Sequence, residues 1–381
     1  MLSRSFLTFE SKFRSDISIL PAAAHNYYVI ASNSSHSRRL EDLTCLRALL
    51  AFWVFSYHLC LQTGARPDHW VGAICHRGYL GVDGFFVLSG FVLAHGGGAP
   101  LSPSGCLRFW GRRLLRIYPL HAATILLLLV LLAAATVAGA SPRDPERFAL
   151  RALWQHLVLI HGWGWADGWA WNYPSWSISS EWAGYLAFPL LAAGMMRLPA
   201  VAAGLAVAAG AVALAWLDRS SGSGLNVTLQ GPLWRFLPEF TAGIALCRTV
   251  RVAAPAHHAG MLASALAALG LAVGWLPDTC VVAALAILIG SLAAIRHGRG
   301  RVLDRLPGLH FLGGLSYAFY MSFALAEMLL SYALRVAGLR PPDQPLLYMA
   351  AMTSLTLLLA AALSFGVERS ALRLLGPTPA S

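Results

Sequence analysis

Charge is the first thing that this chain lacks. Asp, Glu, Lys and Arg together make up 12% of its 381 residues, whereas a soluble domain averages about a quarter. Hydrophobic residues make up 57% and the mean hydropathy is +0.61. Apolar stretches recur from residue 43 to residue 367 with no soluble-sized gap between them. The composition therefore excludes an ordinary soluble protein and predicts one polytopic membrane domain.

Cysteine is sparse as well, and it follows no metal-binding or redox pattern. The six cysteines include no Cys-x-x-Cys pair, so we predict no metal site and no permanently bound cofactor. Cys60 and Cys75 fall near the outer face, where either a disulfide or two free thiols would fit. The net charge of +11 comes almost entirely from arginines in short clusters between apolar runs. This pattern indicates contact with the lipid bilayer and argues against nucleic acid as a partner.

Hydropathy predicts ten membrane-spanning helices. They cover residues 43–62, 78–96, 118–140, 176–194, 199–217, 232–250, 259–276, 279–295, 311–333 and 346–367. Because ten is even, both chain ends face one side, and the distribution of Lys and Arg places that side in the cytoplasm. We therefore predict an all-α polytopic integral membrane helical bundle at residues 43–370. A disordered cytoplasmic tail (1–42) precedes it and a short cytoplasmic tail (371–381) follows it.

Two ionisable residues share the first predicted span. Arg47 and His58 lie eleven residues apart, which is about three helical turns, so both side chains leave the same face about 16 Å apart along the axis. Arg47 falls near the cytoplasmic end of the span, and His58 lies past its middle, nearer the outside. Ionisable groups inside a bilayer are costly, so we predict a functional site along this face.

Two carboxylates are expected at the depth of His58. The second span runs inward from the outer face and carries Asp83 near its start, and the fourth span also enters from outside and carries Glu181. Counted at about 1.5 Å per residue, the three titratable groups share one plane. Asp83 also suits a structural role, because Gly81 and Gly84 favour close helix packing beside it.

A cluster of arginines lies between the second and third spans. If this segment is helical, Arg108, Arg112 and Arg116 form one cationic stripe at the cytoplasmic face, where Arg47 also lies. A phosphorylated cytosolic ligand would suit such a stripe. Alternatively, these arginines only fix the orientation of the protein in the membrane and contact anionic lipids.

The longest outer segment, residues 141–175, carries His156, His161 and a run of tryptophans. These tryptophans are Trp163, Trp165, Trp169 and Trp171. Tryptophan rings favour the headgroup level of a bilayer, so an interfacial belt is the first interpretation. A stacking platform for sugar rings is the second.

Taken together, these segments resemble the acyltransferase 3 family of integral membrane acyltransferases over nearly all of residues 40–370. The matching motifs are Arg47-x10-His58 and residues 78–83 (GYLGVD), 85–90 (FFVLSG), 112–119 (RRLLRIYP), 176–181 (WSISSE), 235–240 (RFLPEF), 316–320 (SYAFY) and 368–369 (ER). Any one of them is a weak signal, but the set in this order is specific.

The resemblance implies an enzyme, an O-acyltransferase that transfers groups other than aminoacyl groups. It would move an acyl group, usually acetyl, from a cytosolic acyl-CoA to a hydroxyl of an extracytoplasmic or lipid-linked acceptor, commonly a cell-surface polysaccharide. It also implies a location in the bacterial cytoplasmic (inner) membrane. On this interpretation Arg47, Arg112, Arg113 and Arg116 bind the acyl-CoA donor, whose long arm extends along the helix toward His58.

Acylation of a hydroxyl needs a base for the alcohol proton and a group that stabilises the tetrahedral oxyanion. We assign His58 as that base or as a transient acyl carrier. Glu181 or Asp83 would orient the imidazole, and the sequence does not choose between them. Glu327, in the ninth span at a similar outer depth, is a candidate contact for the acceptor.

Three further features complete the sequence-based interpretation. Arg235 and Glu239 lie four residues apart in the sixth span, which predicts an ion pair between them. Phe323 stands where many family members have a histidine, and Gly84 replaces a common leucine, so a mechanism that needs a second histidine in the ninth span is in doubt. Some relatives carry a fused extracytoplasmic hydrolase-like domain. We expect this chain to have none, and therefore to act alone or with a separate periplasmic partner.

A transporter of an anionic solute or a glycan precursor is the alternative function, because intramembrane charge alone allows it. Such a transporter is expected to contain an inverted repeat with broken helices. The motifs at residues 81–83 and 177–181 do not recur in the second half of the chain. The sequence therefore favours the enzyme.

Overall fold

The computed structural model describes the chain from residue 40 to residue 373, with gaps. The gaps are residues 97–99, 140–141, 143, 253–257, 295–302 and 341–342. Most of the two predicted cytoplasmic tails lies outside the described residues. Within the described residues the chain forms helices and contains no strand, which confirms the all-α class.

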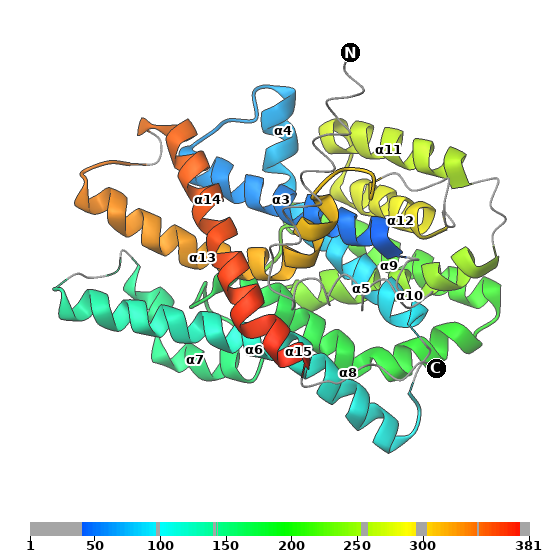
Figure 1. Ribbon diagram of the computed structural model, residues 1–381. Coiled ribbons are helices and arrows are strands. Elements are labelled where there is room, and N and C mark those ends of the chain that lie inside the picture. The colour runs from blue at the N-terminus through cyan, green and yellow to red at the C-terminus, as the bar shows by residue number, and fades with distance from the viewer. Residues whose placement is uncertain are drawn as a thin grey trace, which may run out of the picture.

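The helices follow one another along the chain with short connections (Figure 1). The first half contains α3 (Glu41–Thr63), α4 (Trp70–His76), η2 (Gly78–Leu80), α5 (Gly81–His95), α6 (Pro103–Val137), η3 (Pro145–Phe148), α7 (Leu150–Leu157), η4 (Tyr173–Ser175) and α8 (Trp176–Arg197). The second half contains α9 (Ala200–Ser220), α10 (Pro232–Val252), α11 (His258–Trp275), α12 (Asp278–Ala294), α13 (Leu309–Val336), α14 (Pro345–Leu363), η7 (Ser364–Glu368) and α15 (Arg369–Arg373).

Each of the ten predicted spans coincides with a helix, but six helices in the described part of the chain are long and apolar enough to cross a membrane. These six are Glu41–Thr63, Gly78–His95, Pro103–Val137, Ala200–Ser220, Leu309–Val336 and Pro345–Arg373. Three of the other predicted spans fall short for physical reasons. Polar residues such as Glu181 and Arg235 lower the mean hydropathy of α8 and α10, and α12 is too short. The number of spans and the side on which the termini lie stay predictions.

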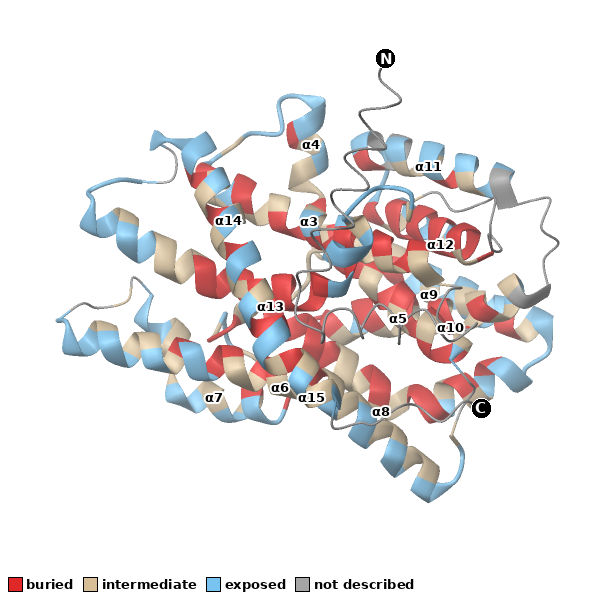
Figure 2. Cartoon of the chain, in the orientation of Figure 1, coloured by how far each residue is buried: buried red, intermediate tan, exposed pale blue. Residues whose placement is uncertain are grey.

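α3 lies at the centre of the bundle, packed against α13 on one side and against α5 and α12 on the other (Figure 1). Buried residues gather along these helices, while the C-terminal end of α6 is exposed (Figure 2). Burial differs widely among the candidate spans: 72% of the apolar window of Gly78–His95 is buried inside the protein, but only 11% of that of Ala200–Ser220. An apolar helix that exposes Val201, Leu205 and Val212 is suited to contact with lipid.

Local sequence signals set the ends of the helices that carry the candidate site. α3 ends at Gly64, whose φ of +67° is the left-handed conformation that glycine adopts without a Cβ clash. α6 begins where the Ser102 side chain accepts a hydrogen bond from the Gly105 N–H at 3.1 Å and Pro103 takes the first helical position. Its 35 residues include both the arginine motif and the predicted third span, which form one continuous helix.

Two glycines allow α5 and α10 to pack at close range. A Cβ at Gly243 would meet the carbonyl oxygen of Val87 on α5, and a Cβ at Gly90 would meet the carbonyl oxygen of Phe240 on α10. Small residues at such reciprocal positions let two membrane helices approach each other closely. This packing brings together the two helices that carry Asp83 and Arg235.

Replacing Gly243 with alanine is expected to destabilise the bundle. The added methyl group overlaps backbone, which cannot move aside as a side chain can, and overpacking of this kind costs about 1–3 kcal/mol. The measurement is the melting temperature of the purified protein in detergent. Gly204→Ala is the matched control, because a Cβ at Gly204 meets no atom within 4 Å. Equal melting temperatures for the two variants would contradict the prediction.

Candidate active site

His58 lies in α3 inside a ring of aromatic side chains. Its imidazole packs on the Phe323 ring with 4.7 Å between ring centroids, and on Tyr57 and Tyr173 at 5.2 and 5.6 Å. One polar contact is present in the described surroundings: Nδ1 lies 3.4 Å from the Tyr173 hydroxyl oxygen. An imidazole held by ring packing and one polar contact keeps its second nitrogen, Nε2, for other chemistry.

Tyr173 connects His58 to a carboxylate. The Tyr173 hydroxyl donates a hydrogen bond to Oε2 of Glu327 at 3.0 Å, so His58 Nδ1–H can donate to the same hydroxyl oxygen. Burial and the Glu327 carboxylate hold the pKa of Tyr173 well above its usual range, which keeps the hydroxyl protonated. Arg147 lies over the Tyr173 ring at 4.7 Å and supplies a positive charge nearby. The result is a histidine–tyrosine–glutamate chain of hydrogen-bonding groups.

The N-terminal end of α3 lies in a second cluster, which we call the arginine cluster: Arg47, Arg113, Arg116, Glu181 and Glu368. Arg47 on α3 interacts electrostatically with Arg116, Glu181 and Glu368. Arg116 forms an ion pair with Glu368, which reaches it from η7 near the C-terminal end of the described chain. Three guanidinium groups against two carboxylates leave the cluster positive.

Two guanidinium groups of this cluster retain unused hydrogen-bonding capacity. The Nε atoms of Arg47 and Arg113 are buried and have no hydrogen-bond partner in the part of the chain that the structure describes. Arg113 also lies over the rings of Phe109 and Tyr185 at 5.5 and 5.9 Å. The cluster is therefore a partly buried cationic region with donors available for an anion.

Only some of the arginines predicted to bind the donor lie in this cluster. Arg113 and Arg116 point into the bundle, whereas Arg108 and Arg112 are exposed on the surface of α6. The spacing of four residues correctly predicted a helix. The face of that helix that packs inward, however, carries Arg113 and Arg116, which are three residues apart. A role for Arg112 in donor binding stays a prediction without support from this geometry.

Glu181 lies with the arginine cluster and not beside the imidazole. Its Oε1 accepts hydrogen bonds from the hydroxyls of Ser89 at 2.6 Å and Tyr185 at 2.7 Å. Among the described contacts none joins Glu181 to His58. Counting depth along each span omitted the direction in which the side chain leaves its helix, so the predicted partnership with His58 lacks geometrical support.

Asp83 is fully buried and forms an ion pair with Arg235. The Arg235 guanidinium donates from Nε to Oδ1 at 2.8 Å and from Nη2 to Oδ2 at 2.5 Å, and Nη2 also donates to the Tyr79 carbonyl at 3.0 Å. The ion pair predicted between Arg235 and Glu239 is therefore wrong, because Arg235 pairs with Asp83. The buried Glu239 carboxylate lies near both groups and interacts with them electrostatically. Asp83 links α5 to α10, and no described contact joins it to His58.

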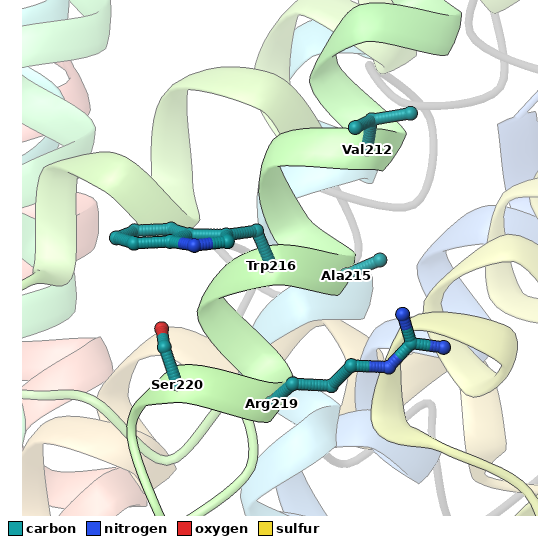
Figure 3. Close-up of a pocket in the computed structure, with 5 residues that line it drawn as sticks. All are labelled: Val212, Ala215, Trp216, Arg219 and Ser220. Carbon is teal, nitrogen blue, oxygen red and sulfur yellow. The ribbon is translucent and has the colours of Figure 1, made fainter.

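A cavity of about 290 Å³ lies under the tryptophan-rich loop between α7 and α8 and is lined partly by Tyr173, so it reaches the His58 chain. A second cavity, of about 500 Å³, is lined by five residues of α9 alone (Figure 3). Trp216 and Arg219 extend from α9 in different directions in that view. An exposed Trp beside an Arg near the end of an apolar helix is typical of the membrane–water interface.

The comparison with known proteins decides the family. Residues 40–365 match the acyltransferase domain of the acyltransferase 3 type. The chain belongs to the acyltransferase 3 family. The acyltransferase MdmB of Streptomyces mycarofaciens is 32% identical over 337 residues, which cover 79% of this chain and 81% of that protein. No solved structure gives a significant match.

Membership of the acyltransferase 3 family confirms the resemblance drawn from the motifs and makes the protein a membrane acyltransferase. The family departure at Phe323 now has a location, because its ring packs directly on His58 and on Tyr173. Sequence reasoning missed Tyr173 and the role of Glu368. Tyr173 precedes a proline at the start of the fourth predicted span, and nothing in that local pattern indicated its contact with α3.

Proposed function

We propose that this membrane acyltransferase is an O-acyltransferase that moves an acyl group, acetyl in the first instance, from cytosolic acyl-CoA to a hydroxyl of an extracytoplasmic or lipid-linked glycan. We further propose the bacterial cytoplasmic membrane as its location. The observation that carries the proposal is that one unbroken helix, α3, has Arg47 of the arginine cluster near its first end and His58 near the other.

The donor end of the proposal rests on the arginine cluster. A CoA molecule is anionic through its phosphates, and the unpartnered Nε–H groups of Arg47 and Arg113 can donate to phosphate oxygens. About 16 Å along α3 separates Arg47 from His58. The flexible arm of CoA can cover such a distance and bring its thioester to the imidazole.

At the outer end, His58 is proposed as the general base. Nδ1–H donates to the Tyr173 hydroxyl, which donates to Glu327, so Nε2 keeps its lone pair for the acceptor proton. As Nε2 takes that proton, the acceptor oxygen attacks the thioester carbonyl carbon. The carbon–sulfur bond then breaks, and the CoA thiolate leaves and takes the proton from the imidazolium. Glu327 stabilises the transient imidazolium through Tyr173, which is the role that the sequence had assigned to Glu181 or Asp83.

Replacing Arg47 with alanine is expected to raise the KM for acetyl-CoA by about tenfold to a hundredfold, because a charge-assisted hydrogen bond to a phosphate contributes about 1.5–3 kcal/mol. The measurement is release of free CoA by the purified protein with a glycan extract as acceptor. Arg197→Ala is the control, since Arg197 is exposed at the end of α8. An unchanged KM in Arg47→Ala, or no CoA release by the unaltered protein, would contradict the donor assignment.

The transporter alternative rests on intramembrane charge alone. Transport would appear as solute flux into proteoliposomes in the absence of acyl-CoA. Flux that persists in the His58→Ala variant would count against the enzymatic proposal.

A further inference from the structure

The cavity of about 290 Å³ beneath the tryptophan-rich loop has no role in the chemistry described above. Its walls come from α7, the loop that follows α7, the first turn of α8 and the segment at Thr228. The residues that matter to the argument are Gln155, His156, His161, Trp169, Tyr173 and Trp176. Ligand pockets usually start at about 300 Å³, so this cavity suits one small ring rather than a polymer.

Aromatic rings form much of this lining. Trp176 is buried with 7% of its surface exposed, while Trp169 is 45% exposed and lies edge-on to Tyr173 at 5.8 Å between centroids. Such rings offer flat apolar faces next to polar groups. The C–H face of a pyranose ring packs well on surfaces of this kind, while its hydroxyls need hydrogen-bond partners.

A buried imidazole in the lining offers one such partner. His161 Nε2 lies 2.9 Å from Ser175 Oγ, whose own hydroxyl donates to the Asn172 carbonyl at 2.7 Å, so Nε2 carries the proton and donates. The other nitrogen, Nδ1, is therefore an acceptor, and it has no hydrogen-bond partner in the described chain. His161 is only 6% exposed.

The charge of the cavity favours a neutral ligand. Burial and the stacked rings of His156 and His121 hold the pKa of His161 well below its usual range, so its imidazole is neutral at pH 7. The charged residues at the rim are of both signs, Glu146 and Asp167 against Arg151, and all three are exposed. Arg147, which lies over the Tyr173 ring, is not part of the lining, so the lining itself offers no buried charge to a strongly anionic or strongly cationic ligand.

Tyr173 places the cavity next to the proposed catalytic base. It lines the cavity, and its hydroxyl oxygen lies 3.4 Å from His58 Nδ1. A ligand in the cavity therefore lies one side chain, that of Tyr173, away from His58.

We propose that this cavity is the acceptor subsite, and that it takes one neutral pyranose ring by stacking on Trp169 and by a hydroxyl that donates to His161 Nδ1. The subsite rests on the proposed function, because it supplies the hydroxyl to be acylated. It also gives a use to the tryptophan-rich loop beyond an interfacial belt.

The test measures sugar binding directly, without acyl-CoA. The full-length protein is purified in a detergent that has no sugar headgroup, and saturation-transfer NMR is recorded with methyl glucoside, methyl glucosaminide, methyl glucuronide and cyclohexanol. We expect methyl glucoside to bind, with about threefold to tenfold weaker binding to Trp169→Ala, since an aromatic contact contributes about 0.5–1.5 kcal/mol. Trp169→Phe keeps an aromatic face and should retain most of the binding.

Trp165→Ala is the matched control, because Trp165 is 62% exposed in the same loop and does not line the cavity. Absence of methyl glucoside binding, equal binding to Trp169→Ala and the unaltered protein, or stronger binding of a charged glycoside or cyclohexanol would each overturn the subsite. If methyl glucoside binds in a manner that depends on Trp169 but is not acylated when acetyl-CoA is added, the subsite stands and the proposed transfer reaction fails.

Discussion

Replacing His58 with alanine is expected to lower kcat for acyl transfer by about 10²- to 10⁴-fold, because a positioned general base contributes that much to a proton-transfer step. The KM for acetyl-CoA should change little, since the donor's charged end is proposed to bind at the arginine cluster. The measurement is initial-rate kinetics of CoA release by the purified protein. His58→Gln, which keeps the size and polarity of the side chain, should lose as much activity as the alanine variant.

A chemical rescue separates this role from a structural one. Added imidazole should restore part of the activity of His58→Ala, because the variant leaves space between Tyr173 and Phe323 where the ring had been. His69→Ala is the control, since His69 is exposed beyond the C-terminal end of α3. Full activity in His58→Ala, or an acetylated His58 that persists when acyl-CoA is supplied without acceptor, would contradict the base assignment. The second result would make His58 an acyl carrier.

Replacing Asp83 with alanine is expected to destabilise the protein by about 3–5 kcal/mol, because it breaks a fully buried ion pair and removes both hydrogen bonds that the Asp83 carboxylate accepts from Arg235. The measurement is the melting temperature in detergent together with the yield of folded protein. Asp68→Ala is the control, because Asp68 is exposed in the connection between α3 and α4. A melting temperature equal to that of the control would contradict the prediction.

A paired substitution distinguishes structure from catalysis at this position. Asp83→Leu combined with Arg235→Met replaces the ion pair by apolar side chains, which often restores or increases stability. If Asp83 acts only by linking α5 to α10, the double variant should be both folded and active. A folded but inactive double variant would return Asp83 to the catalytic role that the sequence first assigned to it.

The positions of residues along one helix were predicted well, although the ion pair expected within α10 between Arg235 and Glu239 was not found. Arg47 and His58 share an unbroken α3, as their spacing of eleven residues indicated, and the arginine motif is helical as its spacing indicated. Both predictions depend on helical periodicity alone, which is fixed by backbone geometry.

Partners on different helices were predicted poorly. Glu181, Asp83 and His58 were placed at one depth, yet the hydroxyls of Ser89 and Tyr185 bind Glu181 and the Arg235 guanidinium binds Asp83. Depth along a span is one coordinate, and helix tilt and rotation supply the others. Those are set by packing, such as the close approach of α5 and α10 at Gly90 and Gly243.

The sequence by itself determined that the protein is an all-α membrane protein of the acyltransferase 3 family and that Arg47 and His58 occupy one face of one helix. Composition, apolar run length and local motifs carry that information, because each acts within a single segment. Only the tertiary structure decided that Tyr173 and Glu327 adjoin His58, that Glu368 pairs with Arg116, and that Asp83 pairs with Arg235. These contacts join residues far apart in the chain, and their existence depends on how the helices tilt and pack against one another.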